Sequence, residues 1–329
     1  MNKATTNERN SSLQALRFIF VMMIFMSHFN YHVTSSFDAG GDCGVAFFFL
    51  LSGFVMSMGY GRGINDGTFN FKRYITRRLI KIYPLHLLCL IVFLVLFRPE
   101  IDHRLPLNAL LLQSWIPDDN YYFYYNGVSW FLSSLLFCYL VFPFIYRFSN
   151  RLTLAAVLIG CLIVYMIVPY SQINALLYVF PPVRFVDFFI GIMLYKHYNS
   201  REKKPVSSWI EPLLMVLLAL ALVAYPYTDE KLRNAPLYWF VLIPIIYVFV
   251  QQQGSVSRFL QWRILQWLGS LSMPIFMLHP IVFRSIIHFF PSLPYGVMLV
   301  LCFAFTVLFS WITDRLFLRY IEQRKILLK

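Results

Sequence analysis

Long apolar stretches separated by short polar segments run through almost the whole chain. A bilayer-spanning helix needs about 20 mainly apolar residues, and ten stretches have roughly that length. The sequence therefore predicts an all-α, polytopic membrane protein with about ten transmembrane helices. The predicted spans are residues 13–30, 43–60, 79–97, 128–146, 152–170, 174–195, 209–226, 236–251, 267–289 and 295–314.

One further apolar segment, residues 105–116, is too short to cross a bilayer. Its length of about 12 residues is typical of a re-entrant or interfacial helix. We therefore expect it to fold back between the third and fourth spans without crossing the membrane.

Composition agrees with a membrane protein, and charge gives an orientation. Hydrophobic residues make up 59% of the chain and charged residues 13%, about half the usual share. A formal net charge of +13 would indicate a nucleic-acid partner in a soluble protein. Here the Lys and Arg residues gather in alternate loops, which predicts cytoplasmic loops, both termini inside, and lipid rather than nucleic acid as the partner. The predicted inner residues include Arg62, Lys72, Arg73, Arg77, Arg78, Lys81, Arg147, Arg151, Lys196, Arg201, Lys203, Lys204, Arg258 and Arg263, and the outer ones are Arg98, Arg104, Lys231 and Arg233.

No internal repeat or long linker divides the chain. We expect a cytoplasmic tail at residues 1–12, a membrane domain at 13–314 and a basic cytoplasmic tail at 315–329. The expected location is the cell's inner or plasma membrane, as a multi-pass protein.

Arg17 and His28 are the most informative pair, because an ionisable residue inside a span is a functional candidate by default. Eleven residues separate them. At about 100° per residue this is three full helical turns plus about 20°, so the two side chains share one face of the helix. The rise between them is about 16 Å, which places His28 in the outer part of the membrane when Arg17 lies near the cytoplasm.

A basic segment precedes the third span. Arg78 and Lys81 are one helical turn apart within residues 72–84 and would face the same way. Such a cluster suits phosphates or anionic lipid headgroups, and topology or lipid contact alone also explains it.

Two later spans also carry charge or histidine. Arg184 and Asp187 have the i, i+3 spacing of an ion pair, which favours a structural role. His279 and Arg284 follow Pro274, in a span that prolines are expected to bend or break.

Several common catalytic motifs are absent from the sequence. It has no Walker or dinucleotide glycine loop, no nucleophile-elbow serine, no HExxH and no acidic metal-binding cluster. We therefore expect no metal cofactor, with histidine as the available general base and arginines to hold an anionic cofactor.

Five segments together resemble the acyltransferase 3 family of integral membrane acyltransferases. They are LQALRFIFVMMIFMSH at residues 13–28, GDCGVAFFFLLSGF at 41–54, RRLIKIYP at 77–84, PPVRFVDFFIGIMLY at 181–195 and LGSLSMPIFMLHPI at 268–281. Two positions depart from the family pattern. Lys81 replaces the second arginine of Arg-x-x-Arg, and the middle-helix motif Trp-Ser-Leu-x-x-Glu reads Trp130 to Leu135 here, without the acid.

The resemblance implies transfer of an acyl group, most often acetyl, from cytoplasmic acyl-CoA to a hydroxyl of a cell-surface polysaccharide or lipid-linked glycan. It implies His28 as the catalytic residue, either as general base or as acyl carrier. The candidate cofactor-binding residues are Arg17, Arg77, Arg78, Lys81 and Arg184, and the further site candidates are Asp187, His279 and Trp130.

The alternative function is a transporter, flippase or ligase of lipid-linked sugars, which would share the same composition. Transporters commonly interrupt their helices at glycines, yet the chain has only 14 Gly in 329 residues. The enzyme is thus the favoured hypothesis. Sequence patterns leave open which sugar, which hydroxyl and which acyl chain are involved.

Overall fold

The computed structural model describes residues 10–33, 40–202, 207–234 and 236–321, with the backbone alone at Tyr31. Residues 1–9 and 322–329 of the predicted tails, and Lys203 and Lys204 of a predicted cytoplasmic loop, lie outside the described residues. Every regular element in the described ranges is helical, which confirms the all-α prediction. The longer helices are α1 Ser11–Val33, α2 Gly41–Asn65, α3 Phe71–Phe97, α6 Trp130–Phe148, α7 Arg151–Ile167, α8 Pro181–Ser200, α9 Ile210–Ala224, α11 Pro236–Phe249, α13 Arg263–Ser270, α14 Ser272–Phe289 and α15 Tyr295–Thr313.

Each of the ten predicted spans overlaps one of these helices. Eight helical segments in the described part of the chain are long and apolar enough to cross a bilayer, and α7 joined to residues 170–179 across a bend of 116° makes a ninth. The remaining predicted span, 174–195, corresponds to α8, which carries the charged residues Arg184, Asp187 and Lys196. The exact number of crossings, the orientation of both termini and the domain boundaries stay predictions.

The predicted span 174–195 is divided in the structure. A π-helical turn at Ile173–Val179 ends before Phe180, and α8 begins at Pro181. Two consecutive prolines explain the division, because proline lacks the N–H that continues a helix and disfavours helical geometry in the residue before it. The span 267–289 is likewise broken at Leu271, between α13 and α14. Pro274 falls in the first turn of α14, where a missing N–H costs nothing.

Helices α2 and α8 form the most extensive contact in the bundle. Two glycines allow this approach. A Cβ atom on Gly53 would lie 1.9 Å from the carbonyl oxygen of Phe188, and one on Gly191 would lie 2.0 Å from that of Leu50. Small residues at a helix interface let the backbones meet closely, which compensates for the weak hydrophobic drive between helices in lipid.

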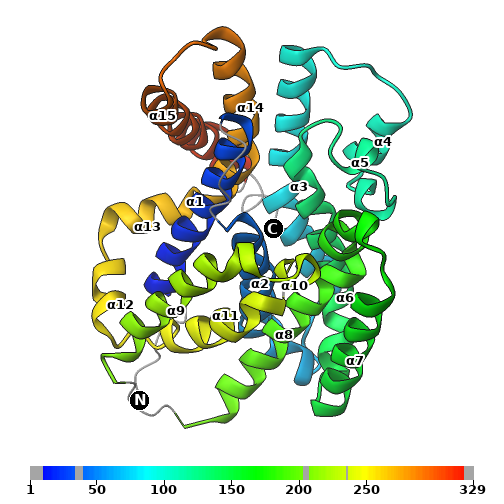
Figure 1. The fold of residues 1–329 in the computed structure, drawn as a ribbon. Coiled ribbons are helices and arrows are strands. Elements are labelled where there is room, and N and C mark those ends of the chain that lie inside the picture. Colours follow the sequence, from blue (N-terminus) through cyan, green and yellow to red (C-terminus); the bar gives the residue numbers. More distant parts are fainter. Residues whose placement is uncertain (1–9, 34–39, 203–206, 235, 322–329) are drawn as a thin grey trace.

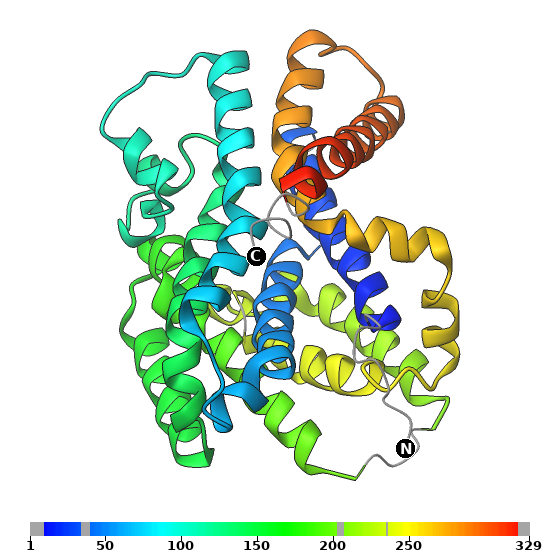
Figure 2. The same ribbon diagram turned by 180° about the vertical axis from the view of Figure 1, so that it is seen from behind.

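Helix α1 lies between α13 and α2 (Figure 1). It contacts α2, α13 and α14. In both views α14 and α15 lie together at one end of the bundle, and α3 stands on the other side of that end (Figure 2). Helix α1 therefore stands where α2, α13 and α14 come together.

The segment 105–116 does not form a crossing helix, as expected. It contains the short helices α4 Arg104–Ala109 and η1 Gln113–Trp115. The Tyr83 hydroxyl donates to the carbonyl of Ala109 at 2.8 Å, and His86 Nε2 lies 2.8 Å from that of Asn108. His86 is buried and eleven residues before the end of α3, or about 16 Å along the helix. The segment thus packs deep against α3.

Candidate active site

Arg17 and His28 both contact α14. Arg17 Nε donates a hydrogen bond of 3.1 Å to Oγ of Ser272, the first residue of that helix. His28 Nδ1 lies 3.0 Å from Nε2 of His279, seven residues further along α14. The two helices therefore run in the same direction at this contact, and the face that the sequence assigns to Arg17 and His28 is the one packed against α14.

His279 is completely buried, whereas His28 is half-buried. The second ring nitrogen of His279, Nδ1, lies 3.1 Å from the carbonyl oxygen of Ile275. Aromatic rings surround the imidazole, with the Phe283 centroid at 5.3 Å and those of Phe25 and Phe276 each at 6.1 Å. The structure thus joins two histidines that the sequence places 251 residues apart.

A cavity of about 750 Å³ opens beside the N-terminal half of α1. This volume is within the range of roughly 300–1,000 Å³ that is usual for small-molecule and cofactor sites. Three of the predicted cofactor-binding cations, Arg17, Arg78 and Lys81, line it. They come from α1 and from the first turns of α3, so the fold brings together charges more than 60 residues apart in the chain.

Arg78 has an unsatisfied hydrogen-bond donor. Its Nη2 atom donates to the Tyr60 hydroxyl at 2.8 Å, and its guanidinium lies 5.3 Å from the Tyr60 ring centroid. Its buried Nε atom has no hydrogen-bond partner in the described part of the chain. A buried donor without a partner costs about 1–3 kcal/mol, which an anionic ligand in the cavity would recover.

Sequence reasoning missed other polar residues of this cavity. Tyr139 and Ser52 lie on its wall, and Asp314 and Arg319 from the end of α15 and the turn after it complete its lining. Arg319 Nε donates to Asp314 Oδ2 at 2.8 Å. The one available signal was the excess of basic residues after position 314, which the sequence assigned only to a tail.

His28 is not among the residues that line the cavity. A row of aromatic rings leads from the cavity wall towards the histidine pair. The Phe48 ring, on the wall, is 6.4 Å from Phe131, Phe131 is 5.1 Å from Phe276, and Phe276 is 6.1 Å from His279. These rings thus form a continuous aromatic packing between the cavity wall and His279, the partner of His28.

Arg184 and Asp187 lie away from the cavity and form a buried ion pair of 2.9 Å. Arg184 also donates to the carbonyls of Tyr178, Leu177 and Asn234, so each guanidinium nitrogen is engaged. The Trp239 indole donates to the second oxygen of Asp187 at 2.6 Å. This network ties α8 to α11 and to the π-helical turn before it. The structure gives this pair the structural role and does not bring Arg184 to the other cations.

Two remaining candidates also lie outside the cavity lining. Arg77 is exposed at the start of α3. Trp130 is buried at the start of α6, with its ring 4.8 Å from that of Tyr178. In the described part of the chain, no three His, Cys, Asp or Glu side chains gather in a way that would hold a metal ion.

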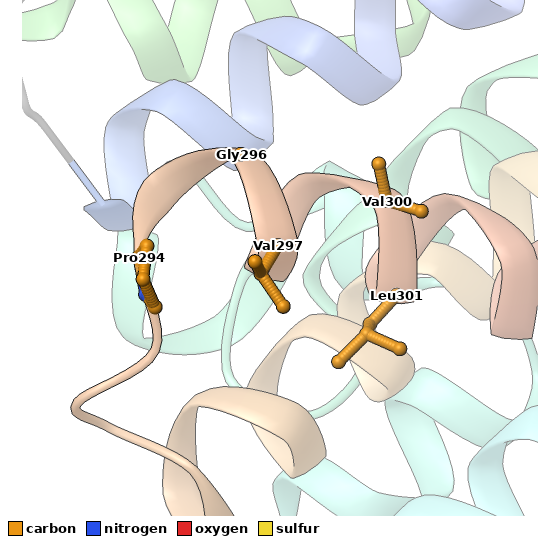
Figure 3. A pocket seen from close by; sticks show the side chains of 5 residues that line it. All are labelled: Pro294, Gly296, Val297, Val300 and Leu301. Atoms are coloured by element: carbon orange, nitrogen blue, oxygen red, sulfur yellow. The ribbon is translucent and has the colours of Figure 1, made fainter.

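A second hollow, of about 480 Å³, lies on α15 and is lined by Pro294, Gly296, Val297, Val300 and Leu301. Figure 3 shows these side chains along the first turns of the helix. Val300 is 65% exposed. An open hollow with apolar side chains of this kind suits contact with lipid. Its lining side chains include no polar group that could bind a polar substrate or take part in catalysis.

Comparison with known proteins gives one family and two relatives. Residues 10–315 match the sequence model of a family described as an acyltransferase domain. The chain is 31% identical to "Acyltransferase MdmB" of Streptomyces mycarofaciens over 182 residues, and this alignment covers 47% of this chain and 46% of that protein. Over 303 residues it is 26% identical to "Putative peptidoglycan O-acetyltransferase YrhL" of Bacillus subtilis (strain 168), which covers 79% of this chain and 47% of that protein.

The chain thus spans a little under half the length of each of these relatives. No solved structure matches it.

Proposed function

The chain belongs to the acyltransferase 3 family, and from that premise we propose that it is an acyl-CoA-dependent O-acyltransferase of a glycan. The acyl group, acetyl in the simplest case, passes from cytoplasmic acyl-CoA to a hydroxyl of a surface polysaccharide or a lipid-linked saccharide. The protein works as a multi-pass protein of the cell's inner or plasma membrane.

The observation that carries this proposal is the meeting of Arg17, Arg78 and Lys81 around one cavity of about 750 Å³. Phosphate is the anion that arginine forks and lysine bind best. The unsatisfied Nε of Arg78 is a donor already in place for it. Arg77 lies outside the cavity on the same helix and adds positive potential near its mouth.

His28 then acts on the far end of the donor. As general base it takes the proton of the acceptor hydroxyl while that oxygen attacks the thioester carbonyl. The carbon–sulfur bond breaks, the CoA thiolate leaves and takes the proton back from His28, and the products are an ester and free CoA. As acyl carrier, His28 would first displace CoA itself and then pass the acyl group to the hydroxyl.

The acyl arm has to pass the rings of Phe131 and Phe276 to reach His28. Both are packed edge-on or tilted against their neighbours, and side chains of this kind can turn aside when a ligand binds.

The acceptor is proposed from the relative named as a peptidoglycan O-acetyltransferase. The test supplies radiolabelled acetyl-CoA to membranes that contain the protein, with peptidoglycan as the acceptor probe and mass spectrometry of the cell's glycans beside it. Label in ester linkage to glycan is expected. His28→Ala should reduce the transfer by at least ~10²-fold, the smallest contribution usual for a general base.

The matched control is His288→Ala, at an exposed position in the last turn of the same α14 helix. It should transfer label normally. Full transfer by the His28→Ala variant would remove His28 from the mechanism. Label that stays on CoA with every glycan, while the protein still moves lipid-linked sugar across the membrane, would support the transporter instead.

The two roles of His28, general base and acyl carrier, predict different labelling of the protein when the reaction is stopped. If His28 carries the acyl group, protein that is incubated with labelled acetyl-CoA alone and then denatured retains label on the peptide that contains His28. If His28 is a base, the peptide is unlabelled and CoA is released only when acceptor is present.

A further inference from the structure

The geometry points to His279 as a positioning residue that fixes the tautomer and the ring orientation of His28. This inference rests on the proposed function for its catalytic meaning, but it makes a structural claim that holds or fails by itself. The claim is that His28 carries its proton on Nδ1 and its lone pair on Nε2.

The argument starts from the backbone of α14. A carbonyl oxygen only accepts hydrogen bonds, so His279 Nδ1, 3.1 Å from the Ile275 carbonyl, must carry a hydrogen. The neighbouring carbonyl, that of Phe276, is also near this turn of the helix. It lacks its usual helical donor because that donor would be the N–H of residue 280, which is a proline.

The next step concerns the other nitrogen of His279. A neutral imidazole has one N–H, and in His279 that hydrogen is on Nδ1, so Nε2 is an acceptor. His279 is completely buried among Phe25, Phe276 and Phe283. An uncompensated positive charge in such surroundings is costly, which favours the neutral ring. The titratable groups that act on it in the described part of the chain are His28 and His32, both from α1.

The third step derives the donor and acceptor roles of the His28 nitrogens from those of His279. Nε2 of His279 accepts, and it lies 3.0 Å from Nδ1 of His28, so His28 Nδ1 must donate. In the neutral ring that a base or nucleophile requires, the remaining nitrogen of His28, Nε2, then holds the lone pair. This is the atom that either abstracts the acceptor's proton or attacks the thioester.

The contact also orients the ring. The two imidazole centroids are 5.0 Å apart with their planes at 35°, so rotation of the His28 ring about its own axis would break the bond. In many hydrolases a carboxylate holds a catalytic histidine in this way. Here a neutral imidazole, itself held by the backbone carbonyl of Ile275, takes that place.

The decisive measurement is the ¹⁵N spectrum of histidine-labelled, full-length protein in lipid nanodiscs, without any substrate. His28 and His279 are assigned by comparison with the single variants H28N and H279F. We expect the Nδ1–H tautomer for both residues, although the Nε2–H tautomer is the more common one in water. Removing the acceptor with H279F should turn His28 to mixed or Nε2–H tautomers.

Kinetics of the same variants give the second readout. H279F should lower kcat of acyl transfer by roughly 10²-fold, the lower end of a general base's contribution, and leave the KM for acetyl-CoA unchanged. H279Q places an amide oxygen near the lost Nε2 acceptor and should recover much of this loss. The control H288F, exposed on the same helix, should change neither the spectrum nor the rate.

A wild-type spectrum with His28 as the Nε2–H tautomer overturns the inference. So does an H279F protein that keeps both the Nδ1–H tautomer of His28 and the wild-type kcat. If H279F does not fold, H279M is measured in its place with the same expectations. A correct tautomer in a protein that transfers no acyl group would refute the proposed function and leave the positioning contact intact.

Discussion

Arg17 and Ser272 are separated by 255 positions in the sequence, yet the arginine Nε donates a 3.1 Å hydrogen bond to the serine hydroxyl. This contact and the one between His28 and His279 fix α1 against α14 at two points. The first holds the guanidinium at the cavity, and the second holds the imidazole beyond the aromatic rings. The register between the two helices thus sets the relation between the proposed donor site and the proposed base.

Loss of Arg17 should weaken donor binding. A hydrogen bond to a charged group contributes about 1.5–3 kcal/mol, so Arg17→Ala should raise the KM for acetyl-CoA by roughly 10- to 100-fold. Ser272→Ala keeps the positive charge of Arg17 but removes the hydrogen bond that orients its guanidinium. Only a few-fold rise in the KM for acetyl-CoA is therefore expected. Arg151→Ala, exposed at the start of α7, serves as the control for removal of one positive charge. An unchanged KM in Arg17→Ala would exclude this residue from the donor site.

Lys81→Arg should improve donor binding. Lys81 lies at the cavity with a single ammonium group, whereas arginine presents a fork that binds one phosphate through two bonds. We expect a lower KM for acetyl-CoA in Lys81→Arg and a higher one in Lys81→Gln, measured with the same acceptor. Equal KM values in all three proteins would show that position 81 does not touch the donor.

The buried pair of Arg184 and Asp187 should affect stability and not donor binding. Removing one partner of a buried ion pair costs about 3–5 kcal/mol, because the other charge is left without compensation. Asp187→Asn should therefore lower the melting temperature strongly in detergent, while the molecules that stay folded keep the wild-type KM for acetyl-CoA. A specific rise in KM at unchanged melting temperature would return Arg184 to the donor site.

The contact of α2 with α8 should tolerate no added methyl group. Gly53→Ala or Gly191→Ala would place a Cβ atom about 2 Å from a backbone carbonyl of the other helix, so the helices must separate. We expect low expression and a lower melting temperature. Gly59→Ala on the same helix has open space around its Cβ position and is the matched control. Its expected effect is neutral or slightly stabilising, since alanine favours helix over glycine by up to about 1 kcal/mol.

The segment that follows α3 should loosen in acid. The Arg104 guanidinium, hydrogen-bonded to Asp102 at 2.7 Å, holds the pKa of that carboxyl below its usual range. A lowered pKa contributes stability at neutral pH that is lost as the pH falls through it. The protection of residues 98–126 against hydrogen exchange, taken relative to the intrinsic exchange rate at each pH, should therefore fall at acidic pH, and Asp102→Asn should show the lower protection already at pH 7. Exchange that is the same in both proteins at all pH values would contradict this.

Much of the fold could be predicted because apolar length and proline position are local properties. Each of the ten predicted segments contains a helix, and the segment 105–116 forms only short helices. The sequence also indicated the break at Pro181 through its two prolines, although we predicted one continuous span there. Whether α8 crosses the membrane depends on what covers its charges, and Trp239 and Asn234, which do so, lie some 50 residues away.

For the site, the sequence by itself determined that Arg17 and His28 share a face, because the helical period is fixed by backbone geometry. It also determined that Arg78 and Lys81 lie one turn apart at the start of a span. Only the tertiary structure decided that His279 meets His28, that the cations of α1 and α3 line one cavity while Arg184 stays apart, and that aromatic rings pack between this cavity and His279. These outcomes depend on the register and packing of helices far apart in the chain, where each contact reflects all the others and no local spacing encodes it.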